Sequence, residues 1–106
     1  MKINEKINNF YNDLQYSECI PEWFMNLELI QDNIDNGWSG YVSIIGTDNK
    51  FFYSLDYSYG SCPVCDEWYD FTEEEMKKEF EMRILKYSFE EYEELKKRCK
   101  DDNLMN

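Results

Sequence analysis

Two residues separate Cys62 from Cys65 in the run Cys-Pro-Val-Cys, where a turn would present both thiols together. Such a pair suits redox chemistry, metal binding or a tight structural turn. A redox pair needs a lowered thiol pKa, which comes from a helix amino end or from nearby cations. Asp66 and Glu67 follow the pair, and their negative charge would raise the thiol pKa instead. Redox catalysis is therefore the least favoured of the three.

Zinc is the alternative cofactor. A structural zinc site takes four ligands, and this chain has no histidine and only two further cysteines, Cys19 and Cys99. Those two would have to converge on Cys62 and Cys65, or two chains would have to share the site. In a reducing cytosol the cysteines are expected to be thiols or metal ligands. Our main prediction is no cofactor, with the pair as small thiols in a tight turn.

The segment around this pair is rich in both acids and aromatics, and every charged residue between Phe51 and Met76 is acidic. Acids at helix starts are explained by the helix dipole, but the acids of the predicted β-region are not. Together with aromatics they would form a binding face of the hot-spot kind. Core aromatics with solubilising acids are the competing interpretation. The predicted partner-binding residues are Asp56, Tyr57, Tyr59, Asp66, Glu67, Trp68, Tyr69 and Asp70.

The net charge of −12 is unevenly distributed. Fourteen acids and one base, Lys50, lie between Ile7 and Met76, whereas residues 77–106 hold eight of each sign. Such a field repels nucleic-acid backbones and anionic membranes and speeds encounter with basic proteins. We therefore expect a basic protein surface as partner, with no direct nucleic-acid or membrane binding.

Nothing in the sequence selects a catalytic group. The chain has no histidine to titrate near neutral pH, and it contains no phosphate loop, nucleophile elbow or metal-hydrolase motif. No apolar run follows the N-terminus or approaches the length that spans a bilayer. We expect a cytoplasmic protein that is not an enzyme.

The length of 106 residues fits one domain, and 18% aromatic residues favour a folded chain despite its charge. Apolar spacing predicts helices near 3–16 and 21–36, the second ending at Asn36-Gly37. Strands are expected at 41–45 and 51–57, joined as a hairpin by residues 46–49.

A third strand is predicted at 68–71, with the segment 62–65 as the preceding turn. Thr72 and Ser88 each precede a glutamate by three residues, a capping-box pattern that predicts a helix from Glu73 and another after a break near Ser88. Residues 101–106 are expected to fray. The prediction is an α+β fold in which a small antiparallel sheet of two to three strands packs against about four helices.

The run from Tyr57 to Trp68 contains Tyr-Gly-Ser-Cys-x-x-Cys-Asp, which resembles a segment of small uncharacterised proteins of bacteriophages and prophages. The match covers about a dozen residues, and Pro63-Val64 replaces the Ser-Gly of those proteins. The resemblance implies a phage or mobile-element origin and, by class analogy, an inhibitor of host defence.

The functional hypothesis is therefore an acidic phage or mobile-element protein that inhibits a host nucleic-acid-handling complex, such as a CRISPR effector or another defence nuclease. Its carboxylates would occupy phosphate positions on a basic surface, as a nucleic-acid mimic does. The alternative is a small structural or assembly module that binds zinc through Cys62 and Cys65.

Overall fold

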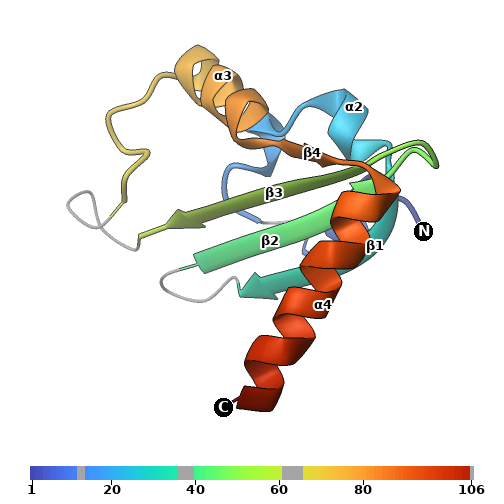
Figure 1. Cartoon of the computed structure of the whole chain (residues 1–106). Coiled ribbons are helices and arrows are strands. Elements are labelled where there is room, and N and C mark those ends of the chain that lie inside the picture. Colours follow the sequence, from blue (N-terminus) through green and yellow to red (C-terminus); the bar gives the residue numbers. More distant parts are fainter. Residues whose placement is uncertain (12–13, 36–39, 61–65, 106) are drawn as a thin grey trace.

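The computed structural model describes residues 1–11, 14–35, 40–60 and 66–105, and of residues 99–105 it describes the backbone alone. Within them a four-stranded antiparallel sheet, ordered β1-β2-β3-β4, carries helices on both faces (Figure 1). The α+β class is confirmed, but the predicted number of two to three strands is wrong. The strands are β1 (Glu28–Asp35), β2 (Gly40–Thr47), β3 (Phe52–Tyr59) and β4 (Leu85–Tyr87). The helices are α1 (Ile3–Phe10), α2 (Glu22–Met25), α3 (Glu73–Arg83) and α4 (Phe89–Met105), with a 3-10 turn, η1, at Ser17–Cys19.

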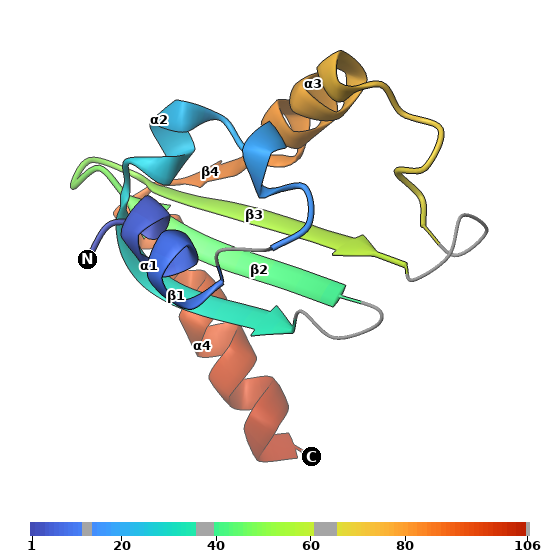
Figure 2. The same ribbon diagram turned by 180° about the vertical axis from the view of Figure 1, so that it is seen from behind.

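The alternation of side chains along β3 separates the two faces of the sheet. Leu55 and Tyr57 point to one face, where the Tyr57 ring lies 4.7 Å from the ring of Phe80 in α3. Phe52 points to the other face and stacks on Tyr92 of α4, with ring centroids 4.1 Å apart. Figure 2 shows α1, α2 and η1 on the same side as α3. The main core therefore lies under these helices, and α4 covers part of the opposite face.

The predicted β2–β3 hairpin is confirmed, and its turn explains the register. The Asp48 carboxylate accepts the backbone N–H groups of Lys50 and Phe51, each at 2.8 Å. These bonds hold the pKa of the Asp48 carboxylate below its ordinary value, and the bond from the Phe51 N–H has the largest effect. Asn49 has a φ of 73°, the left-handed conformation that asparagine tolerates well. Local turn chemistry therefore fixes how β2 and β3 pair.

Both predicted capping boxes are present. Thr72 Oγ1 accepts the Glu75 N–H at 3.2 Å, and the Glu75 carboxylate accepts the Thr72 N–H at 3.1 Å. Ser88 and Glu91 make the same pair of bonds at the start of α4, each at 3.1 Å. The helix start at Glu73 and the break near Ser88 are thus confirmed.

The predicted helix at 21–36 is wrong over most of its length. Only α2 is helical, and Glu28–Asp35 instead forms β1, with Ile34 opposite Val42 of β2. A bulge between Leu29 and Gln31 interrupts the strand alternation, and Ile30, which the helical spacing placed on an apolar face, is 44% exposed. Pairing with β2 satisfies a row of its backbone groups, and this outweighs a weak local propensity. The predicted stop at 36–37 lies outside the described residues.

The third strand predicted at 68–71 is also wrong. Tyr69 N–H donates to the Asp66 carbonyl at 3.2 Å, and Phe71 N–H donates to the Trp68 carbonyl at 3.0 Å, so this segment is a succession of tight turns. The strand next to β3 is β4, which lies within the helix predicted from Glu73 to the break near Ser88. Its three residues pair with β3 from Phe52 to Ser54.

The first helix is shorter than predicted and the last is longer. α1 ends at Phe10, and Tyr16, inside the predicted helix 3–16, has a left-handed φ of 67°. The backbone of α4 continues as a helix to Met105, where fraying was expected. No helix in the described ranges combines the length and apolar character needed to cross a membrane.

The close contact between Gly40 and Tyr59 generates a stability prediction. A Cβ atom at position 40 would lie 1.9 Å from Tyr59 Cζ, on the directly paired residue of β3. Gly40→Ala should therefore lower the free energy of unfolding by about 1–3 kcal/mol, since the buried ring must move. Urea unfolding of the single variants and of Gly40→Ala in a Tyr59→Leu background measures the coupling. An equal cost of Gly40→Ala in both backgrounds would show that the ring is not the obstacle.

Candidate functional site

Three of the predicted partner-binding aromatics belong to the core. Tyr57, Tyr59 and Trp68 are 2%, 7% and 1% exposed. The Trp68 indole N–H donates to the Ser58 carbonyl at 2.8 Å, and its ring lies 4.9 Å from that of Phe80. The prediction that these rings contact a partner is wrong, because Trp68 folds back onto the end of β3 instead of extending as an edge strand.

Asp66 is likewise committed to the fold. It is buried, its carboxylate accepts the Tyr16 hydroxyl, and its other oxygen accepts the Trp68 N–H at 3.0 Å. Burial and this carboxylate raise the pKa of Tyr16 to about 12. Asp66 therefore ties the loop before η1 to the turn that carries Trp68 and is not available to a partner.

The remaining predicted residues do not form one surface. Glu67 is paired with Arg83 at 3.1 Å, and the Arg83 guanidinium lies 4.5 Å from the Trp68 ring. Tyr69 is 61% exposed and Asp70 is exposed beside it. Asp56 is exposed on the opposite face of the sheet, the face that carries α4. The predicted eight-residue face is thus reduced to Tyr69 and Asp70, with Asp56 apart from them.

The alternative four-cysteine zinc site requires Cys19 and Cys99 to converge on Cys62 and Cys65. Cys19 lies in η1, under the helices of one face, whereas position 99 lies in α4 on the other face (Figures 1 and 2). Cys62 and Cys65 lie outside the described residues. Among the residues whose positions are described, no group of three or more histidine, cysteine, aspartate or glutamate side chains is placed to hold a metal ion.

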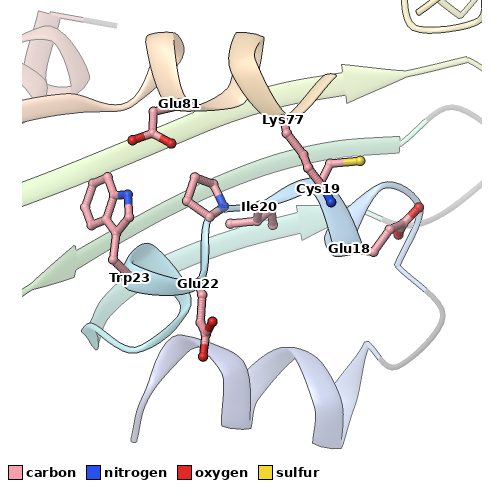
Figure 3. A pocket seen from close by; sticks show the side chains of 8 residues that line it. Glu18, Cys19, Ile20, Glu22, Trp23, Lys77 and Glu81 are labelled. Carbon is pink, nitrogen blue, oxygen red and sulfur yellow. The ribbon is translucent and has the colours of Figure 1, made fainter. Parts of the chain in front are cut away.

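A pocket of about 440 Å³ lies between residues 18–23 and α3. Figure 3 shows Trp23 and Glu81 at one end of it and Lys77 and Cys19 at the other, with the carboxylates of Glu18 and Glu22 directed outward. Trp23 is 42% exposed. Its ring is held edge-on to the Tyr53 ring at 5.3 Å and to the Phe24 ring at 6.1 Å. The pocket therefore presents a fixed and partly exposed indole at the same end as the Glu81 side chain.

Sequence reasoning missed this pocket. Trp23 lies four residues before Leu27 and seven before Ile30, so in the predicted helix it would share their apolar face, and the spacing gave no indication that its ring is exposed. The approach of α3 to η1, which closes the pocket, depends on tertiary packing.

Chemistry at Cys19 is disfavoured by its environment. Its thiol is buried, and burial, together with the charges of Glu18 and Glu73, raises its pKa, which Lys77 opposes. A protonated thiol is a poor nucleophile and a poor metal ligand at neutral pH. The pocket is thus better suited to binding than to covalent chemistry.

In comparisons with known proteins, no protein-family model, curated protein or solved structure matches this chain.

The Tyr16–Asp66 hydrogen bond generates a pH-dependent prediction. Tyr16→Phe should lower the free energy of unfolding at pH 8 by about 1–3 kcal/mol, because a buried carboxylate loses its donor. The wild type should lose stability between about pH 10 and 12, since unfolded tyrosine ionises near pH 10 while folded Tyr16 keeps its proton.

Urea unfolding at pH 8 and pH 11 measures both effects. The stability of the variant should fall less between the two pH values, although Tyr57, whose pKa burial also raises, remains in both proteins. An identical fall in the two proteins would contradict the assignment to Tyr16.

Proposed function

We propose that this chain is a non-enzymatic binding protein that occupies the basic surface of a nucleic-acid-binding host protein or complex and thereby blocks access of nucleic acid. The observation that carries the proposal is a set of exposed carboxylates, in the region between Ile7 and Met76, that no base of the described chain pairs. The set includes Glu18, Glu22, Asp48, Asp56, Asp70 and Glu74.

The fold supports this role by holding those charges apart from the compensating bases. In the described chain, Lys77 and Arg83 pair with Glu73 and Glu67 of the acidic region, and the other ion pairs of the C-terminal third join its own residues, as between Lys96 and Glu93. Lys50, the single base between Ile7 and Met76, is exposed in the hairpin turn. The strong negative field therefore persists in the folded protein and favours encounter with a basic partner.

In this proposal the partner is a CRISPR effector or another defence nuclease, and the chain comes from a phage or mobile element. That part rests on the resemblance of residues 57–68 to phage proteins and on analogy between small acidic inhibitors. Exposed carboxylates substitute for phosphates in an Arg- and Lys-lined groove, so inhibition requires no catalytic group.

Salt dependence and competition test the proposed function. The immobilised chain should retain a basic nucleic-acid-binding protein from nuclease-treated host lysate at about 0.1 M salt and release it as salt rises toward about 1 M, because the Debye length falls from about 10 Å to about 3 Å. The purified partner should then bind DNA or RNA more weakly when this chain is present.

Simultaneous binding of nucleic acid and this chain to the partner would contradict the proposal. So would retention that is insensitive to salt, since contacts between exposed charges must be screened.

A further inference from the structure

We infer that the pocket between residues 18–23 and α3 receives an arginine side chain of the basic partner. The inference rests on the proposed function and adds the point of attachment. It starts from Trp23, a large ring left 42% exposed although Tyr53 and Phe24 hold it in place. An immobilised ring with an accessible surface loses little conformational entropy on binding, which is why tryptophan is common at binding hot spots.

The charges around the pocket favour a cation. Glu18, Glu22 and Glu81 line it, all three are exposed, and no ion pair joins them to a base in the described part of the chain. The pocket also contains Lys77, but its ammonium is paired with Glu73 at 3.4 Å. Since Lys77 lies at the Cys19 end, the end formed by Trp23 and Glu81 is the one suited to a positive group (Figure 3).

Arginine fits this end better than lysine. A guanidinium stacks on an aromatic face and can also form two parallel hydrogen bonds to a carboxylate, whereas an ammonium acts as a compact, strongly hydrated charge. The chain already uses this chemistry internally, because Arg83 lies 4.5 Å from the Trp68 ring and pairs with Glu67 at 3.1 Å. The volume of about 440 Å³ falls within the range of ordinary ligand pockets.

The experiment uses an acetylated, amidated tri-arginine peptide as the probe and the matching tri-citrulline peptide, which is neutral, as its control. Indole N–H resonances are followed by NMR, and the Trp23 signal is assigned from its loss in Trp23→Phe. Tri-arginine should shift the Trp23 signal saturably, and tri-citrulline should not.

Three variants test whether the pocket favours a positively charged ligand. Glu81→Gln should weaken tri-arginine binding roughly two- to fivefold, by analogy with exposed cation–π and ion-pair contacts. Lys77→Met should strengthen binding, because a repulsive charge is removed. Glu90→Gln, at the start of α4 on the opposite face, changes the net charge as Glu81→Gln does and should leave binding unchanged. Because Trp23 also supports Tyr53, melting temperatures are measured for all variants.

The outcomes separate this inference from the proposed function. If tri-arginine binds without shifting the Trp23 signal, the pocket is not the binding site, and the charge-based proposal stands. The same conclusion follows if Glu81→Gln and Glu90→Gln weaken binding equally. Equal binding of tri-citrulline overturns the pocket as a cation site. The inference is also overturned if the Trp23→Leu variant, folded and with an unchanged melting temperature, binds the captured basic partner with full affinity.

Discussion

The packing of Trp68 determines how the helices are arranged on their face of the sheet. Its indole N–H is bonded to the Ser58 carbonyl at 2.8 Å, so the turn after residue 66 is fixed to the end of β3. Its ring packs 4.9 Å from Phe80, which places α3 over the sheet. Asp66 then joins this turn to Tyr16. Because one buried side chain joins a turn, a strand and a helix, the position of α3 opposite residues 18–23 follows from it, and so does the pocket between them.

Local chemistry made part of the fold predictable. The capping pairs Thr72–Glu75 and Ser88–Glu91 act within four residues, and so does the Asp48 turn, so their sequence patterns are sufficient. β1 was not predictable in the same way, because its apolar residues recur at spacings compatible with a helix. Its strand conformation depends on the exposed edge of β2, a partner that spacing within one segment does not reveal.

The candidate site was also predictable only in part, but for a different reason. Acids and aromatics alternate between residues 56 and 70, and composition alone does not distinguish a contact surface from a core. The decisive fact is the direction of Trp68, whose side chain turns inward while those of Glu67 and Tyr69 stay at the surface. Trp23 is the reverse case: a tryptophan beside buried residues that remains partly exposed because α2 is only four residues long and ends before it can bury a second face.

Charge and shape act at different stages of the proposed binding. The exposed acids of the N-terminal two-thirds act over a distance of about one Debye length, so they attract any basic surface and confer little selectivity. A pocket with a fixed indole and a nearby carboxylate acts only on contact and requires one cation at one position. Selectivity among basic partners must therefore come from such a contact, because the long-range field attracts all of them. A protein that relied on charge alone would bind many basic proteins, and in the mode of binding proposed here the pocket beside Trp23 would supply the additional constraint.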